Sequence, residues 1–140
     1  MIRLTLAAAL IASFAGLALA AGPRGSAGKD RVFEMRTYHA LEGRGPALHK
    51  RFREHTCELF KKHGMELIGF WTPIDEKEGK ADKLVYILAY PSKAAADKSW
   101  KAFQADPEWV KARDASEADG KIVKKVDSVY LNPTDYSPVK

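Results

Sequence analysis

The feature that most constrains the fold of this chain is an order of hydrophobic periods, strand then helix then strand, that occurs twice between residues 31 and 131. A strand buries alternate residues, whereas a helix buries residues three or four positions apart, so the two periods can be distinguished. Two such units in succession give the order βαββαβ. That order predicts an α+β fold with four antiparallel strands and the helices on one face of the sheet, the ferredoxin-like arrangement.

The first half begins with the segment RVFEMRTYHA (31–40), whose side chains alternate between two strand faces. Phe33, Met35 and Thr37 share one face, and Glu34, Arg36 and Tyr38 share the other. Glu34 and Arg36 are therefore close enough to form an ion pair, which we interpret either as a solvated or interfacial pair or as the floor of a polar pocket. A further strand is predicted over residues 65–73.

A helix is predicted between these two strands. Pro46 suits its first position and Gly45 its cap, and Gly64 suits the left-handed residue just past its end. Its apolar face is marked by residues at steps of four, three and four, namely Leu48, Phe52, His55 and Leu59. At about 100° per residue, His55 falls in the middle of that face and Cys57 on the opposite side.

The second half repeats the pattern. The segment KLVYILAYP (83–91) is almost continuously apolar, which predicts a central strand covered on both faces. Ser92 can cap a second helix, and Asp106-Pro107 can end it and start a short third one. A last strand is predicted over residues 121–131.

The sheet face without helices needs a cover. We expect that face to carry Glu34, Arg36 and Tyr38 from the first strand together with valine and aromatic side chains. A face of that kind does not stay in water across a whole sheet. A second copy of the chain, packed sheet to sheet, is the predicted cover, so we expect a homodimer.

The first thirty residues differ from the rest. Residues 1–20 contain one charge, Arg3, followed by an apolar run that ends in Ala18-Leu19-Ala20. This pattern predicts a Sec-type signal peptide cleaved after Ala20, with a retained anchor as the alternative, and hence a periplasmic or secreted protein without a stable membrane span. Residues 21–30 are rich in Gly, Ser and Pro and are predicted to form a flexible leader. One folded domain then occupies residues 31–138.

The composition argues against a nucleic-acid-binding protein. The 23 basic and 18 acidic residues give a net charge of +5, but they alternate along the chain. A nucleic-acid reader needs a basic stripe interleaved with aromatic side chains, which the sequence lacks. Cys57 is the single cysteine, so the domain is expected to fold without an intrachain disulfide.

Several motifs resemble the NIPSNAP family. They include "FEMRTYHALEGRGPALHKRFREHT", "LVYILAYPSKAAADKSWKAFQADPEWVKARDASE" and "LNPTDYSP", and the resemblance runs from about Val32 to Pro138. It implies a dimeric α/β barrel in which two sheets pack face to face. The biochemical activity of the family is poorly defined, and its wider superfamily contains cofactor-free monooxygenases and haem-degrading enzymes, which are analogies at the level of the fold.

The residues give few grounds for a metal or a covalent mechanism. The histidines His39, His49, His55 and His63 are not spaced as a metal site, so we predict no metal and no cofactor, although haem contact through one histidine is an analogy within the superfamily. His55 is the best catalytic candidate, because a histidine facing the sheet must hydrogen-bond or meet a ligand. A core histidine bonded to a carbonyl or a tyrosine is the alternative.

Two functions therefore stay open. The first is binding of a small organic or apolar ligand between helices and sheet, with or without catalysis. Its predicted ligand-binding residues are Tyr38, His55, Trp71, Tyr86, Trp100 and Trp109, although Trp100 and Trp109 also suit a helix–sheet core. The second is a non-catalytic protein-interaction module that acts through its dimer surface. A pocket lined by His, Tyr and Trp favours the first, and a filled core with an exposed apolar patch favours the second.

Overall fold

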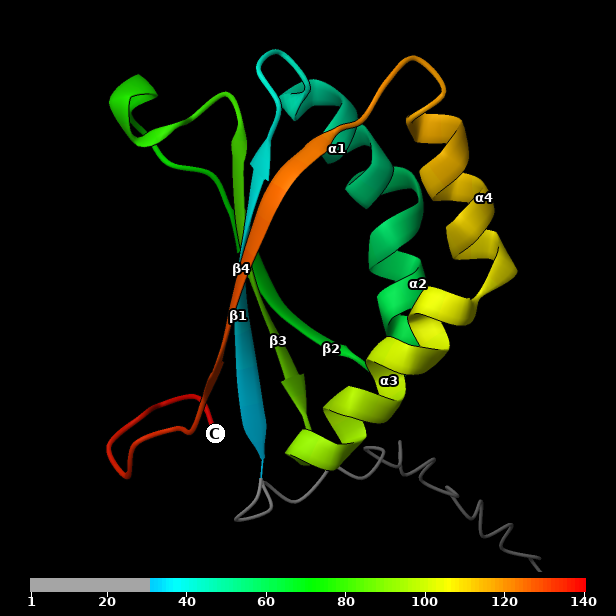
Figure 1. The fold of residues 1–140 in the computed structure, drawn as a ribbon. Helices are drawn as coiled ribbons and strands as arrows, with labels where there is room; N and C mark the ends of the chain where they lie inside the picture. The colour runs from blue at the N-terminus through cyan, green and yellow to red at the C-terminus, as the bar shows by residue number, and fades with distance from the viewer. Residues whose placement is uncertain (1–30) are drawn as a thin grey trace, which may run out of the picture.

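The computed structural model describes residues 31–140, and the predicted signal peptide (1–20) and leader (21–30) lie outside them. A single antiparallel sheet with the strand order β2-β3-β1-β4 forms one layer, and the helices cover one of its faces (Figure 1). The strands are β1 (Val32–Ala40), β2 (Glu66–Trp71), β3 (Lys83–Tyr90) and β4 (Val123–Leu131). The predicted βαββαβ order and ferredoxin-like fold are confirmed, and β3 is a central strand.

The helices follow the predicted segments. The first runs without interruption through α1 (Gly45–Arg51), the π-helical turn η1 (Phe52–Thr56) and α2 (Cys57–Lys62). The second and third are α3 (Lys93–Ala105) and α4 (Pro107–Ser116), and a short 3-10 turn, η2 (Glu76–Glu78), lies between β2 and β3. Within residues 31–140 none of the helices has the length and apolar character of a membrane span.

Local signals set the helix ends. The Ser92 hydroxyl accepts a hydrogen bond from the Ala95 amide at 3.2 Å, and the Asp106 carboxylate accepts one from the Glu108 amide at 2.8 Å. Both residues cap a helix as predicted, because each satisfies an amide that has no partner within its helix. Gly64 has a φ of +74°, which a glycine adopts without steric cost.

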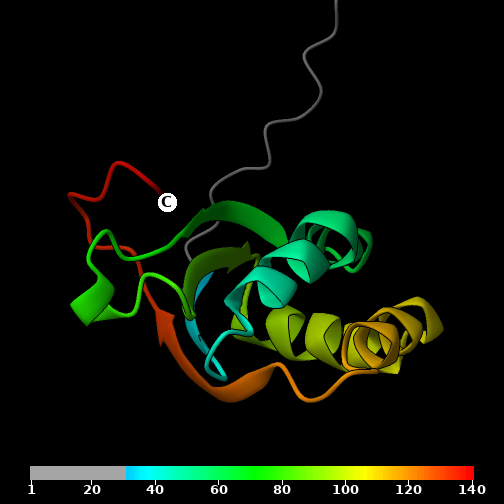
Figure 2. The ribbon, with the colours of Figure 1, turned by 90° about the horizontal axis from the view of Figure 1, so that it is seen from above.

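Aromatic rings fill much of the core between helices and sheet, around which the sheet curves in Figure 2. Phe60 and Tyr86 are fully buried, with ring centroids 5.8 Å apart. The ring centroid of Phe103 in α3 lies 4.9 Å from that of Phe60 and 4.5 Å from that of Trp109 in α4. The aromatic cluster around Asp106-Pro107 therefore joins two helices to the sheet through ring packing.

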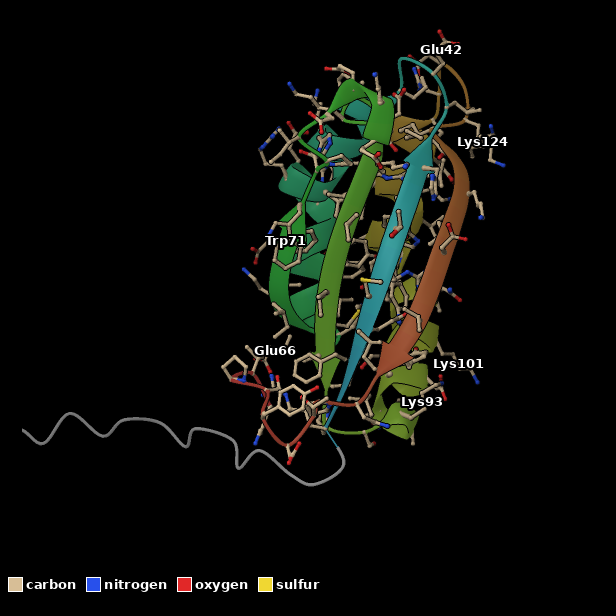
Figure 3. The ribbon with its side chains drawn as sticks, turned by 90° about the vertical axis from the view of Figure 1, so that its left-hand side faces the viewer. Glu42, Glu66, Trp71, Lys93, Lys101 and Lys124 are labelled. Atoms are coloured by element: carbon tan, nitrogen blue, oxygen red, sulfur yellow. The ribbon has the colours of Figure 1, made fainter. Side chains whose placement is uncertain are left out.

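The two faces of β1 are opposite to our expectation. Glu34, Arg36 and Tyr38 lie beneath the helices, where Glu34 is 1% exposed. Phe33, Met35 and Thr37 point to the helix-free face, which Figure 3 shows from the front. Alternation alone fits either orientation, and the observed one is favoured because donors from β3, β4 and α3 surround the Glu34 carboxylate.

The prediction that His55 faces the sheet is wrong: its side chain is exposed, and Thr56 is buried in its place. The cause is the π turn, in which the Cys57 amide bonds to the Phe52 carbonyl five residues back. In this wider turn each residue rotates the chain about the helix axis by a smaller angle than in an α-helix. The fourth residue after Phe52, and not the third, therefore returns to the buried face. The same shift brings Cys57 partly into contact with the core.

Candidate functional site

A buried carboxylate, Glu34 of β1, organises the most polar region between helices and sheet. Its Oε1 accepts hydrogen bonds from Arg36 Nη1 at 2.9 Å and from Ser128 Oγ at 2.6 Å. Its Oε2 accepts from the Tyr90 hydroxyl at 2.8 Å and from Trp100 Nε1 at 2.6 Å. Both oxygens are thus occupied, so Glu34 is suited to hold its neighbours in position.

Arg36 lies between this carboxylate and the aromatic core. Its guanidinium carbon is 4.1 Å from the centre of the Trp100 ring and 5.8 Å from that of Tyr38, and its side chain is 18% exposed. Burial opposes its charge, but Tyr86, Tyr38 and Glu34 outweigh that effect and raise its pKa above the ordinary value. Its Nε is buried and, among the described residues, has no hydrogen-bond partner.

Tyr86 of β3 faces the same region. Its side chain is fully buried, and its hydroxyl also lacks a hydrogen-bond partner within residues 31–140. Burial, and next to it Tyr38, raises the pKa of Tyr86 well above its ordinary value. Tyr38, whose ring centre is 5.6 Å away, is near enough to affect this titration without a hydrogen bond of ordinary geometry. The phenol is therefore a protonated, unused donor at neutral pH.

We call the group formed by Glu34, Arg36, Tyr38, Tyr86 and Trp100 the Arg36 site. Arg36 pairs with Tyr86 in the sheet register, so both project from neighbouring strands toward the helices. Glu34 and Trp100 fix the guanidinium, while Arg36 Nε and the Tyr86 hydroxyl stay free to donate. Two unused donors beside aromatic rings can donate to an acceptor oxygen. Within residues 31–140, the residues of the Arg36 site line none of the four hollows of about 320–480 Å³, so a ligand has to displace part of the surrounding side-chain packing to reach these donors.

The structure separates the predicted ligand-binding residues into distinct places. Tyr38, Tyr86 and Trp100 come together in the Arg36 site. Trp109 packs against Phe103 and, from α4, lies 5.3 Å from the guanidinium carbon of Arg51. Trp71 is 51% exposed on the helix-free side, where its ring covers Gly69 so closely that a Cβ there would lie 2.5 Å from it. His55 is exposed on the first helix and is not buried with these residues.

Sequence reasoning did not include Tyr90 and Ser128 among the site residues. Ser128 lies opposite Arg36 in the sheet, and the neighbouring Tyr130 lies opposite Glu34. The alternation of residues 123–131 places Ser128 and Tyr130 on one strand face, but their contact with the site follows only once the register with the first strand is known. Beyond Tyr130, Lys93 Nζ lies 4.4 Å from the ring centre and marks the exposed rim of the region.

The residues of the Arg36 site do not resemble a metal centre. Across the described part of the chain, no three His, Cys, Asp or Glu side chains are grouped as metal ligands. The chemistry that the site offers is hydrogen-bond donation from a guanidinium and a phenol, with ring faces beside them.

The helix-free side of the sheet forms a second notable surface, which we call the open face. Its apolar part is formed by Met35, Val85, Ile87, Val129, Leu131 and Trp71. Toward the other end the same face carries Thr37, His39, Asp127 and Lys125. Val129 and Leu131 are 43% and 39% exposed. The C-terminal tail and the connection between β2 and β3 project on this side of the sheet (Figure 1). The tail and the sheet enclose a hollow of about 370 Å³ that includes Phe33, Ile68 and Val139.

Comparisons with known proteins agree with this description. A family model, NIPSNAP, matches residues 33–138. A NIPSNAP family protein of unknown function from Agrobacterium tumefaciens is 24% identical, with a TM-score of 0.68 over 80% of this chain and 96% of that one. An uncharacterised NIPSNAP-like domain protein from Burkholderia xenovorans is 16% identical, with a TM-score of 0.67 over 79% and 91%.

A more distant structure, SnoaB, a cofactor-independent oxygenase from Streptomyces nogalater, is 14% identical, with a TM-score of 0.52 over 78% of this chain and 98% of that one. At these identities the structural matches show the fold alone. No curated protein matches the chain.

Proposed function

Since the chain belongs to the NIPSNAP family, we propose that it is a binding protein for a small, mostly apolar organic molecule that carries an anionic oxygen. The oxygen is held by Arg36 and by the Tyr86 hydroxyl, and the apolar body lies against Tyr38 and Trp100. This proposal concerns the Arg36 site only. It keeps the ligand-binding hypothesis but moves its centre from His55 to Arg36.

The observation that carries the proposal is the pair of unused buried donors, Arg36 Nε and the Tyr86 hydroxyl. Leaving a buried polar group without a partner costs about 1–3 kcal/mol. Two such groups in one site therefore favour the binding of an acceptor, because the cost of each is removed when the group donates a hydrogen bond. An anionic oxygen suits both, because a guanidinium and a phenol donate most strongly to a charged acceptor.

Binding is favoured over catalysis by the way Glu34 is used. Its two oxygens already accept from Arg36, Ser128, Tyr90 and Trp100, so it is not free to take a proton from a bound molecule. Donors of this kind also stabilise an enolate, which makes a cofactor-free oxygenase or a haem-related enzyme the further alternative. That alternative rests on analogy within the fold.

A titration with benzoate and benzyl alcohol tests the proposal. The two probes share an aromatic ring, but only benzoate carries an anionic oxygen. In proton–nitrogen correlation spectra we expect benzoate to shift the Arg36 Nε and Trp100 Nε1 signals in a saturable way and benzyl alcohol to do so more weakly. Tyr86→Phe should weaken benzoate binding about tenfold, the loss of one charge-assisted hydrogen bond.

The matched control is Tyr136→Phe, which removes a hydroxyl from the exposed C-terminal tail, outside the Arg36 site, and should leave benzoate binding unchanged. Equal affinity for benzoate and benzyl alcohol would contradict the anionic oxygen. A Tyr86→Phe variant that binds benzoate as tightly as the parent would remove Tyr86 from the site.

We further propose that the functional unit is a homodimer in which the open faces of two copies meet. The supporting observation is a partly exposed apolar surface on the open face, formed by Met35, Val85, Ile87, Val129 and Leu131. Contiguous apolar surface of this kind is typical of a protein–protein contact. Sedimentation at micromolar concentration is expected to give twice the mass of one chain. A folded monomer would contradict it and would leave the open face to another protein, as the interaction-module hypothesis requires.

Export is the third part of the proposal. The apolar run of residues 4–19 and the small residues Ala18 and Ala20 support cleavage after Ala20 and a periplasmic or secreted location. N-terminal sequencing of the exported protein should begin at Ala21. Sequencing that begins at Met1 would favour the retained anchor.

A further inference from the structure

A second hollow lies at the surface of the helix layer, and no residue of the four strands lines it. It has a volume of about 400 Å³ and lies between α1 with its π turn and α4. Its walls include the small side chains Ala47, Ala112, Ala115 and Ala118, which leave the space open. We call it the outer groove. Neither the Arg36 site nor the open face contributes a residue to it.

The outer groove contains a buried cation, Arg51, which is 4% exposed. Its Nη1 donates to Ser116 Oγ at 3.3 Å and to Glu117 Oε1 at 3.2 Å, which links α1 to the end of α4. Its guanidinium carbon is also 5.3 Å from the centre of the Trp109 ring. The Nε of Arg51 is buried and has no hydrogen-bond partner in the described part of the chain.

A purely structural role does not account for that free Nε. The tie between α1 and α4 needs only Nη1, and a lysine or glutamine could reach Ser116 with fewer unused donors. A buried guanidinium with an unused N–H beside an open hollow is the arrangement in which an oxyanion gains a charge-assisted hydrogen bond.

The rim of the groove carries one further cation, Lys50, which forms no ion pair among residues 31–140. The His55 ring lies on the same rim. The π turn brings His55 here, because it rotates this side chain away from the sheet. π turns of this kind occur frequently at functional sites. The residue that sequence reasoning placed in a pocket thus lines a different hollow.

The acidic residues nearby are mostly engaged already. Asp119 accepts two hydrogen bonds from Arg44, at 2.8 and 2.7 Å, and Glu117 accepts from Arg51 and from the Ile122 amide. Glu54 is the acidic rim residue without an ion pair in the described structure. Since Arg51 is paired with Glu117 and Arg44 with Asp119, the charges on the rim that have no ion pair in the described structure are Lys50 and Glu54, one of each sign, and the unused N–H of Arg51 is the feature that favours an oxyanion.

From these observations we propose that the outer groove is a second binding site, for the oxyanion of a small molecule, either a carboxylate or a phosphate. The oxyanion would accept from Arg51 Nε, with Lys50 and His55 at the rim and the alanine walls around the rest of the molecule. The proposal does not depend on the Arg36 site, since the two regions lie on opposite sides of the helix layer.

The test is a titration of the full mature chain with inorganic phosphate and, separately, with acetate, at constant ionic strength set with sodium chloride. The readouts are the Arg51 Nε and Trp109 Nε1 signals in proton–nitrogen correlation spectra. We expect saturable shifts of both signals with at least one probe, and the stronger probe identifies the oxyanion class. Shifts that grow linearly without saturation, as sodium chloride alone produces, would overturn the proposal.

Variants on the groove walls keep the test independent of folding. Ala115 is exposed, so Ala115→Leu should fill the groove without disturbing the core and should weaken binding at least about tenfold. Lys50→Gln should weaken it about threefold to fivefold, as expected for an exposed charge. Lys98→Gln, which removes the same charge from the exposed surface of α3, should leave it unchanged.

Two results would refute the site. One is an Ala115→Leu variant with unchanged affinity and unchanged Arg51 shifts. The other is an equal loss in Lys50→Gln and Lys98→Gln, which would show attraction to net charge in place of a defined groove. A benzoate titration of Ala115→Leu, read at the Arg36 Nε signal, separates the two proposals, because this variant alters the outer groove and leaves the Arg36 site unchanged.

Discussion

The two faces of the sheet reverse the usual distribution of polar and apolar residues. Beneath the helices β1 presents Glu34 and Arg36, which are held by hydrogen bonds and ring contacts. On the open face the same strand presents Met35 between Ile87 and Val129, all in an antiparallel register and without a helix above them. The covered side is thus partly polar, whereas the uncovered side is apolar around Met35.

This contrast teaches that burial and polarity are separate properties of a strand face. A buried carboxylate can lie under helices when both of its oxygens find donors, as the Glu34 oxygens do. An apolar face without a helix, in turn, calls for another cover, and the shape of a single chain supplies only the C-terminal tail at one end. Variants of the two faces should therefore fail in different ways, the first in folding and the second in assembly.

The largest effect is expected for Glu34→Gln. Glutamine keeps the shape of the side chain, but its NH₂ group would face groups that themselves donate hydrogen bonds. Arg36 also loses its counter-charge. Removing one member of a buried ion pair costs about 3–5 kcal/mol, so the free energy of unfolding in urea should fall by that amount. Glu66→Gln is the matched control, since its ion pair with Arg31 is exposed and should contribute less than about 1 kcal/mol. Equal losses in the two variants would erase the contrast between buried and exposed pairs.

The next effect concerns the open face. Ile87→Lys places a charge at the centre of the proposed dimer contact, and an unpaired charge there should weaken association by more than about 100-fold. Sedimentation should then show a folded monomer, with the circular dichroism of the parent. Ala102→Lys adds the same charge on the exposed side of α3 and should stay dimeric. An Ile87→Lys variant that is still a dimer would place the interface elsewhere.

A pair of tyrosine variants compares a used hydroxyl with an unused one. Tyr90 donates to Glu34, so Tyr90→Phe should lower the free energy of unfolding by about 1–2 kcal/mol. Tyr86→Phe removes a buried hydroxyl that has no partner in the described structure, so stability should hold or rise by up to about 1 kcal/mol while benzoate binding falls. A large loss of stability in Tyr86→Phe would mean that its hydroxyl has a structural role.

The same pair predicts a dependence on alkaline pH. Burial, and then the Glu34 carboxylate, raises the pKa of Tyr90 far above its ordinary value. The unfolded chain then releases protons first, so this stabilisation is complete below about pH 10 and is lost as pH rises beyond it. Urea midpoints between neutral and alkaline pH should fall less steeply in Tyr90→Phe than in the parent. An identical slope would contradict the burial of this phenol.

The smallest effect is expected at the exposed rim of the polar cluster. Ser128 is exposed, although its hydroxyl donates to Glu34 at 2.6 Å. Ser128→Ala should therefore cost about 0.5–1.5 kcal/mol, because water can replace the lost donor. Thermal melts of Ser128→Ala and of Tyr90→Phe give the comparison. A greater loss at Ser128 than at Tyr90 would reverse the gradient from buried centre to exposed rim.

Much of the fold could be predicted from the sequence, and less of the candidate site. Tyr38, Tyr86 and Trp100 were predicted to bind a ligand and do lie together, since each belongs to an element whose period was clear. Trp71 and His55 were grouped with them and lie elsewhere. A register shift in β2 between Leu67 and Gly69 places Trp71 opposite Val85 on the open face, and the π turn of the first helix turns His55 outward. Neither irregularity has a signal within a few residues.

The sequence by itself determined the order of the elements and most of their ends, although the first helix begins at Gly45 with Arg44 as its cap, one residue earlier than predicted. Ser92, Asp106 and Gly64 act on backbone groups a few residues away, so their effects can be predicted from neighbours along the chain. Only the tertiary structure decided which residues meet at Glu34, because its partners Tyr90, Trp100 and Ser128 lie 56, 66 and 94 positions away along the chain. A buried charge is stable only where such distant donors converge, and that convergence is a property of the packed sheet and helices.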